Sequence, residues 1–244
     1  MLSIDTRNKF RMKDAQQIAH ELGAEIQSLS EELRAAATHF HLFKALRDAV
    51  PEFQTELNRA PLFWSFTRHA HLQAAAISLC RIYDQDRGSS NFSRFLENVQ
   101  NNLPLFDREQ FWERNKGNLY DLTLIGNARR PCGEEMKADI EFCSDKNPHV
   151  ATLMNWRHNS IAHKNRRIIL GRAAFLESDP LTYEAIHKLI QEGYRILNFY
   201  SILFQGEDFG SFPQKQLNDY QDVLRALKNA PSTGHARANH DEQE

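Results

Sequence analysis

The sequence predicts an all-α helical bundle with two long helices and several shorter ones. Apolar residues recur at spacings of three and four along most of the chain, which is the pattern of one face of an amphipathic helix. Gly occurs 10 times and Pro 8 times in 244 residues, so few positions interrupt this pattern. Apart from residues 167–170, no stretch shows the period-two alternation that indicates a strand. Helices packed on helices are therefore the expected architecture.

The first long helix is predicted to end before Pro51. Its apolar row consists of Ile18, Leu22, Ile26, Leu29, Leu33, Ala36, Phe40 and Phe43. A second helix is expected to begin at Pro61, because proline at the first helical position has no amide that needs a partner. The row of this second helix consists of Leu62, Phe66, Ala70, Ala74, Ile77 and Arg81.

A polar run at residues 84–90 follows the second helix and is predicted to be a loop. It begins like a calcium-binding loop, with Asp84, Asp86 and Gly88 in order. However, the glycine stands one position early, and Phe95 occupies the position that requires a glutamate. We therefore interpret the run as a polar turn.

Shorter helices are predicted in the middle of the chain. Asn91 and Asp107 stand where an N-cap side chain accepts hydrogen bonds from first-turn amides. A break at residues 131–133 precedes a helix over residues 136–143. The second long helix is expected to begin near Thr182, which is also a good N-cap residue.

A last helix is predicted after Pro213, and residues 1–229 are expected to form a single domain. Residues 230–244 are small, polar and charged, which predicts a disordered tail. Residues 1–14 lack the apolar run of a signal peptide, and the sequence contains no run of about 18 apolar residues that could span a membrane. An odd number of cysteines favours a reducing compartment; they are Cys80, Cys132 and Cys143. We therefore expect a cytoplasmic protein without a membrane span.

The stretch from Asn147 to Arg167 carries the residues with the most chemical interest. Asn147 and Pro148 form a helix-start signal, since the asparagine can cap the first turn and the proline needs no amide partner. An apolar edge follows at Val150, Met154 and Ile161. Arg157 falls on the same row, so we expect it at the margin of a core or of an interface.

The charge of this region differs from that of the rest of the chain. Residues 146–176 contain no Asp or Glu and carry a formal charge of +6, whereas the remainder carries −8, for a net charge of −2. One basic segment in a nearly neutral protein is compatible with a local anionic ligand. It does not indicate a general nucleic-acid binder, whose basic residues would dominate the whole chain.

An arginine followed six residues later by a histidine, as in Arg157 and His163, is weak evidence for a functional site when no other feature supports it. Arg34 precedes His39 and His41 at such spacings, and we interpret those residues as ordinary helix surface. On one regular helix, Arg157 and His163 point about 120° apart and lie about 9 Å apart along the axis. They can converge through a bend, or through a second copy of the helix that faces the first.

The string Arg-His-Asn-Ser-Ile-Ala-His at residues 157–163 resembles the motif of the HEPN superfamily of helical domains. That motif begins with an arginine and a polar residue and ends with a histidine, which here are Arg157, His158 and His163. The final Ala-His pair is similar to the AbiU-like abortive-infection branch. The resemblance therefore implies an HEPN-like bundle.

Two upstream stretches, residues 79–86 and 91–93, also resemble that branch. The likeness extends over most of residues 14–205, although only the string at residues 157–163 is specific. Asn165 departs from the pattern, since some toxins of the superfamily carry at this position a tyrosine that a partner nucleotidyltransferase modifies. Silencing of this kind is therefore not expected, although another antitoxin partner remains compatible with the sequence.

The resemblance implies a metal-independent ribonuclease without a cofactor, built as a homodimer whose motif helices face each other. In such an enzyme an RNA 2′-hydroxyl attacks the adjacent phosphate. His163 would act as general base or acid, and Arg157 would stabilise the charge on the phosphate. His158 and Asn159 would orient these groups or bind phosphate. The basic residues expected to guide the RNA backbone are Lys164, Arg166 and Arg167.

A second hypothesis is a noncatalytic helical dimer of the same fold, which serves as an RNA-binding or protein-interaction module. In that case the stem of Arg157 would pack on the core with its head in solvent, and His163 would be a hydrogen-bonded histidine of the bundle. No metal site is expected, because the histidine pairs 39/41 and 69/71 point to different faces of their helices. The first hypothesis places the protein in phage defence or among toxins.

Overall fold

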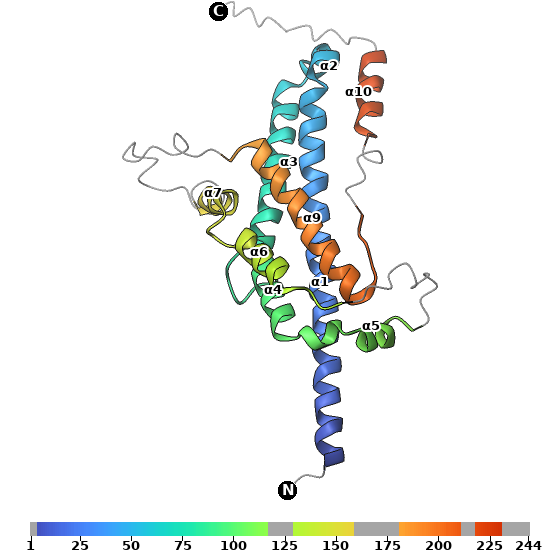
Figure 1. The fold of residues 1–244 in the computed structure, drawn as a ribbon. Coiled ribbons are helices and arrows are strands. Elements are labelled where there is room, and N and C mark those ends of the chain that lie inside the picture. Colours follow the sequence, from blue (N-terminus) through green and yellow to red (C-terminus); the bar gives the residue numbers. More distant parts are fainter. Residues whose placement is uncertain (1–3, 117–128, 159–180, 211–217, 231–244) are drawn as a thin grey trace, which may run out of the picture.

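The computed structural model describes residues 4–116, 129–158, 181–210 and 218–230, with side chains from residue 15 onward. Within these ranges every regular element is a helix, so the predicted all-α bundle is confirmed (Figure 1). The elements are α1 (Ile4–Asp48), α2 (Val50–Leu57), α3 (Pro61–Ile82), α4 (Phe92–Asn101), a 3₁₀ helix η1 (Leu103–Phe106), α5 (Arg108–Arg114), α6 (Gly133–Cys143), α7 (Pro148–Trp156), α9 (Tyr183–Gln205) and α10 (Tyr220–Asn229).

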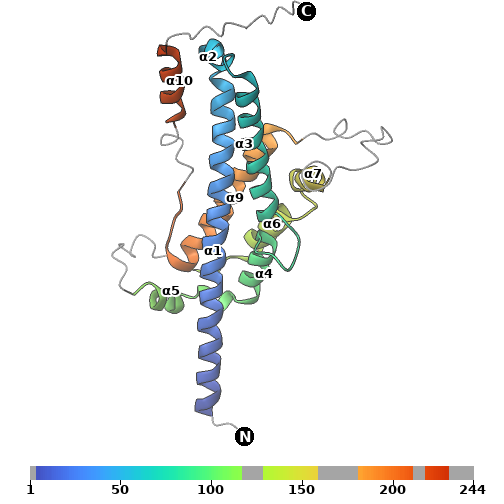
Figure 2. The same cartoon turned by 180° about the vertical axis from the view of Figure 1, so that it is seen from behind.

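The two long helices predicted from the sequence, α1 and α9, form the frame of the bundle. α3 runs beside α1 in both views, and α9 crosses the pair (Figures 1 and 2). The whole apolar row predicted for the first helix, from Leu22 to Phe43, is buried, and Ile18 packs against the same core. α9 contributes its own buried row to this core, which includes Leu189, Leu197 and Tyr200. The core therefore lies where α1, α3 and α9 meet.

α2 is an element that the apolar pattern did not predict. Pro51 does not end helical structure but lies in the first turn of α2, where its missing amide costs nothing. Phe53 and Leu57 of α2 pack on Leu224 of α10 and form a second, smaller cluster of buried side chains. The predicted last helix is present as α10, and residues 231–244 of the predicted tail lie outside the described residues.

Three of the predicted helix caps are confirmed. The side chain of Asn91 accepts a hydrogen bond from the amide three residues further on, at 2.9 Å. Thr182 does the same at 3.1 Å, and Asn147 accepts from the amide two residues further on at 2.9 Å. These caps satisfy amides that would otherwise lack partners at the helix starts.

The capping prediction for Asp107 is wrong. Asp107 stands at the start of α5, but its carboxylate makes no capping bond. Instead it pairs with Arg130, with distances of 2.5 Å from Nε to Oδ1 and 2.6 Å from Nη2 to Oδ2. A two-pronged bond to a guanidinium is stronger than a bond to a neutral amide, and it lowers the pKa of Asp107.

The C-terminal end of α3 is fixed against α9 by close packing. Tyr83 is fully buried, and its hydroxyl donates a hydrogen bond to the carbonyl of Leu189 at 2.6 Å. Gly193 allows this approach, because a Cβ at this position would lie 2.9 Å from Cδ1 of Leu33 and 3.3 Å from Oη of Tyr83. The turn that follows Tyr83 therefore starts from a rigid position.

Candidate functional site

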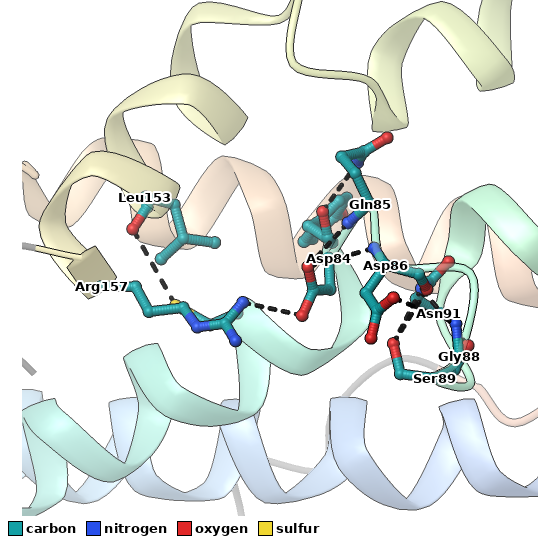
Figure 3. A network of polar contacts seen from close by, with 10 residues as sticks. Asp84, Gln85, Asp86, Gly88, Ser89, Asn91, Leu153 and Arg157 are labelled. Atoms are coloured by element: carbon teal, nitrogen blue, oxygen red, sulfur yellow. Dashed lines mark hydrogen bonds and ion pairs between the residues drawn. The ribbon is translucent and has the colours of Figure 1, made fainter. Parts of the chain in front are cut away.

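An ion pair connects the end of α7 with the turn that follows α3. Nη1 of Arg157 donates a hydrogen bond to Oδ2 of Asp84 at 2.7 Å (Figure 3). The side chain of Arg157 is 36% exposed and that of Asp84 is 20% exposed. The guanidinium is therefore held in a defined position while part of it still faces solvent.

Local folding explains the position of Arg157. α7 buries Val150 and Leu153 completely in the core. Arg157 follows Leu153 by four residues and therefore extends the same face of the helix. The expectation that Arg157 lies at the margin of a core is confirmed, because the helix leaves the core at this point.

Asp84 is oriented by its own turn. Its Oδ1 accepts hydrogen bonds from the backbone amides of Gln85 at 2.8 Å and Asp86 at 3.3 Å. This leaves Oδ2 directed toward Arg157 (Figure 3). The side-chain amide of Gln85 donates to the carbonyls of Tyr83 and Cys143, both at 2.9 Å, and so ties the turn to α6.

The remainder of the turn is also closed by hydrogen bonds. Oδ1 of Asp86 accepts from the amide of Gly88 at 3.1 Å, and the carbonyl of Asp86 accepts from the buried side chain of Asn91 at 2.7 Å. The carboxylate of Asp86 thus stabilises the turn by accepting a hydrogen bond within it. The interpretation of residues 84–90 as a polar turn agrees with these bonds. Among the described residues, no group of three side chains is placed to hold a metal ion.

The thiol of Cys80 lies beneath the ion pair. It contacts the carbonyl of Leu153, with 3.9 Å between Sγ and O. Burial raises the pKa of Cys80 to about 12, whereas the opposite charges of Arg157 and Asp84 have smaller and opposing effects. Cys80 is therefore a neutral packing residue and not a nucleophile.

The structure describes only part of the predicted site. Arg157 and His158 are described, and His158 is exposed. The remaining candidates are outside the described residues, so their positions relative to Arg157 stay predictions; they are Asn159, His163, Lys164, Arg166 and Arg167.

The arginine and histidines near Arg34 were expected to be ordinary helix surface, and the structure differs from this expectation for one of them. Arg34 is exposed, but His39 is half-buried and its Nδ1 lies 2.9 Å from Nδ1 of His71 on α3. The prediction of ordinary surface is therefore wrong for His39, because the residue contributes to the α1–α3 contact. Burial, and to a lesser degree the neighbouring His39, lowers the pKa of His71.

A cavity of about 950 Å³ lies elsewhere, between α1, α9 and α10. Its lining includes Phe40, His41, Lys44 and Tyr194. α10 and α7 lie on opposite sides of α1 in both views (Figures 1 and 2). The cavity is therefore separate from the Asp84–Arg157 pair, and it does not include the residues that resemble a known motif.

Comparison with known families decides the assignment of the fold. The family model described as AbiU2, of the HEPN domains, matches residues 19–227, a range that includes both Asp84 and Arg157. The chain belongs to the AbiU2 family. A comparison with curated proteins and a comparison with solved structures found no match. The predicted HEPN-like bundle of the AbiU branch is confirmed by this match.

The role of Asp84 was missed by reasoning from the sequence. Asp84 was assigned to a polar loop, although it belongs to residues 79–86, one of the stretches that resemble the AbiU2 family. The string at residues 157–163 is the other main stretch, and the structure joins the two through the 2.7 Å bond between Arg157 and Asp84. Two distant stretches that resemble one family are candidates for contact, and this signal could have found Asp84.

None of the described helices of this AbiU2-family chain is both long and apolar enough to cross a membrane.

Proposed function

We propose that this AbiU2-family protein is a metal-independent endoribonuclease that acts in phage defence or as a toxin. The observation that carries the proposal is the partly exposed guanidinium of Arg157, which Asp84 holds at the end of α7, directly before the rest of the family motif. In this proposal Arg157 binds the scissile phosphate, and His163 transfers protons.

The position of Arg157 suits a phosphate ligand. The bond from Nη1 to Oδ2 of Asp84 anchors one end of the guanidinium, and the remaining N–H groups of such a fork can bind phosphate oxygens in pairs. During cleavage the phosphate gains negative charge as the new bond forms. An arginine that is already oriented stabilises this charge without rearranging at the moment of reaction.

The reaction needs a base and an acid. The RNA 2′-hydroxyl loses its proton to a base and attacks the adjacent phosphorus, while the 5′-oxygen leaves and takes a proton from an acid. The products are a 2′,3′-cyclic phosphate and a free 5′-hydroxyl. Histidine titrates near neutral pH and can serve in either role, so two copies of His163 would supply one base and one acid.

A homodimer provides these two copies. Arg157 and His163 diverge on one regular helix, and a second chain that faces the first would bring its own motif to the same phosphate. His158 and Asn159 would orient the groups, and Lys164, Arg166 and Arg167 would bind the RNA backbone nearby.

One observation favours a second candidate function. The charge of Arg157 is balanced by Asp84, as it would be in an arginine that only joins α7 to α3. A noncatalytic helical dimer that binds RNA or a protein would keep this contact. The two candidates differ in whether the protein cleaves RNA.

The test compares His163→Ala and Arg157→Ala with the wild type on a set of structured and unstructured RNAs. We expect each substitution to reduce the cleavage rate by about 10²- to 10⁴-fold, the usual effect of losing a proton-transfer or charge-stabilising group. Circular dichroism and size-exclusion chromatography should show an unchanged fold and an unchanged oligomeric state.

Arg34→Ala is the matched control, because Arg34 precedes two histidines at a similar spacing on an exposed part of α1. Its cleavage rate should equal that of the wild type. Full activity of His163→Ala would contradict the site assignment. A wild-type protein that binds these RNAs without cutting them would favour the noncatalytic module.

A further inference from the structure

The N-terminal half of α3 exposes large apolar side chains. Leu62, Phe63 and Phe66 are 73%, 61% and 70% exposed, whereas most residues of this size are buried in the rest of the described chain. Leu62 and Phe66 belong to the apolar row predicted from the sequence for this helix, so a row of core-like composition lies on the surface. An exposed apolar patch rimmed by polar residues indicates a contact surface.

Leu62 and Phe66 also belong to a second row of α3 positions, which leads toward the Asp84–Arg157 pair. At 100° per residue, its members fall within a sector of about 60° of the helix surface. They are Leu62, Phe66, Gln73, Ile77 and Cys80, and Asp84 follows in the turn two residues beyond the end of the helix. α7 covers the C-terminal part of the row, where Sγ of Cys80 contacts the carbonyl of Leu153 and Asp84 binds Arg157. The exposed part therefore lies on the same side of α3 as the candidate site, which lies beyond the C-terminal end of this helix.

We infer that the part of this row that α7 leaves uncovered, from Leu62 to Ile77, is the surface on which a second copy of the chain docks, with α3 packed parallel to α3 of the other copy. The inference rests on the proposed function, because that function requires two motifs to meet. The spacings of four, seven and four residues from Leu62 through Phe66 and Gln73 to Ile77 match the seam of a parallel two-helix contact. Ala70, between Phe66 and Gln73, leaves room for close approach.

The exposed apolar area suits a homodimer. From the exposed fractions, Leu62, Phe63 and Phe66 present roughly 400 Å² of apolar surface. A stable dimer buries about 800 Å² per partner, of which about 65% is apolar in homodimers. These three side chains therefore supply most of the apolar area that one partner needs, and the surrounding polar residues of α3 and α7 supply the rim.

The parallel arrangement follows from the position of the site. Asp84 lies 14 residues beyond Ala70, which is about 21 Å along a helix axis. If α3 packed antiparallel around Ala70, the two Asp84–Arg157 pairs would lie about 42 Å apart. A parallel contact along a two-fold axis places both pairs at the same end of the dimer, where one RNA phosphate can reach residues of both chains.

The first experiment introduces a charge into the row. Phe66→Asp should convert the dimer into a monomer in sedimentation measurements, with an unchanged helical circular dichroism spectrum, because Phe66 is exposed within the single chain. The matched control is Val223→Asp, which changes an apolar side chain on α10 that is 54% exposed and should leave the dimer intact. A wild-type chain that stays monomeric, or a Phe66→Asp variant that stays dimeric, overturns the proposal.

The second experiment tests the direction of packing by cysteine crosslinking. In a Cys132→Ser background, Leu62→Cys alone and Ile77→Cys alone should each form a covalent dimer on mild oxidation. In an antiparallel contact, neither variant would form a covalent dimer alone, and a crosslink would form only between Leu62→Cys and Ile77→Cys when the two variants are mixed. This result would overturn the parallel arrangement. Cys80 and Cys143 are buried and remain unchanged as internal controls.

The outcomes separate this inference from the proposed function. A dimer that depends on Phe66 but cuts no RNA supports the docking surface and contradicts the ribonuclease. A wild-type protein that cuts RNA as a dimer, while Phe66→Asp remains an active dimer, supports the ribonuclease and overturns the docking surface.

Discussion

Two of the aspartate–arginine pairs that join elements of this bundle differ in their surroundings. Asp139 on α6 binds Nη2 of Arg195 on α9 at 2.5 Å, and its other oxygen accepts a hydrogen bond from the hydroxyl of Tyr200 at 3.0 Å. The side chain of Asp139 is only 3% exposed. The side chain of Asp84 is 20% exposed; its Oδ1 accepts hydrogen bonds within its own turn, and its Oδ2 accepts from Arg157. Both arginines are partly exposed, Arg157 at 36% and Arg195 at 50%, so the difference lies in the aspartates.

The two pairs differ in how deeply the aspartate is buried and in how many further groups share it. Arg195 also binds Glu192, which binds Lys188, so Asp139 belongs to a network along α9. Burial, followed by the charge of Asp139, raises the pKa of Tyr200 and keeps its hydroxyl protonated as a donor. Both carboxylate oxygens of Asp139 thus accept hydrogen bonds from side chains of α9. Arg157 can exchange part of its solvent contact for a phosphate without leaving Asp84.

The largest effect that this comparison predicts is on stability. Asp139→Ala should reduce the free energy of unfolding by about 1–3 kcal/mol, because it leaves the buried hydroxyl of Tyr200 without its acceptor. Asp84→Ala should cost about 1 kcal/mol or less, since its partner is partly exposed and solvent screens the pair. Urea denaturation of both variants measures the two values. Equal losses would contradict the distinction between the pairs.

The next effect is on activity. Asp84→Ala should lower kcat/KM for RNA cleavage by about 10- to 100-fold, because Arg157 loses the acceptor that fixes its guanidinium. Asp86→Ala is the control: it removes a neighbouring carboxylate that bonds only within the turn among the described residues. If both variants lose activity equally, the turn as a whole matters and the bond to Arg157 has no separate role.

The two pairs also show what the sequence could and could not predict. The apolar spacing predicted α1, α3 and α9, because each repeats over several turns, and the caps at Asn91, Asn147 and Thr182 mark their helices locally. The partners of Asp84, Asp107 and Asp139 were not predictable in this way. Each is bound by an arginine from another element, and such a contact depends on how the helices pack.

The candidate site likewise combines a feature that local spacing predicted with a contact that depends on how the helices pack. The position of Arg157 at a core margin was predicted from spacing, because Arg157 stands on the row of Val150, Met154 and Ile161. The bond to Asp84 spans 73 residues and appears only when α3 and α7 pack together. The convergence of His163 with Arg157 lies outside the described residues and stays a prediction.

A third polar pair gives a smaller effect, which depends on pH. Nδ1 of His39 lies within hydrogen-bond distance of Nδ1 of His71, at 2.9 Å, and burial lowers the pKa of His71 from 6.5. A lowered pKa in the folded state means that the unfolded chain binds protons more readily. The stability from this group is therefore present above about pH 6.5 and is lost as the pH falls below that value.

The measurement compares the melting temperature of the wild type and of His71→Gln at about pH 8 and about pH 5.5. We expect the wild type to lose about 1 kcal/mol more on acidification than the variant does, which is the usual net contribution of one hydrogen bond. His69→Gln is the matched control, since His69 is exposed on the same helix. An identical acid response of wild type and His71→Gln would show that the pair does not titrate with folding.

The smallest effect concerns how tightly the Asp84–Arg157 pair closes over Cys80. With its pKa raised from 9.0 to about 12, the Cys80 thiol forms about a thousandfold less thiolate than an ordinary cysteine at the same pH. A thiol reagent at about pH 8 should therefore label the exposed Cys132 quickly and Cys80 only when α7 opens. Arg157→Ala should speed the labelling of Cys80 severalfold and leave Cys143, which is buried beside α9, unchanged. If Arg195→Ala instead increases the rate at which Cys80 is labelled, the network around Asp139 controls the opening of α7. The Asp139–Arg195 and Asp84–Arg157 pairs are then coupled through the core.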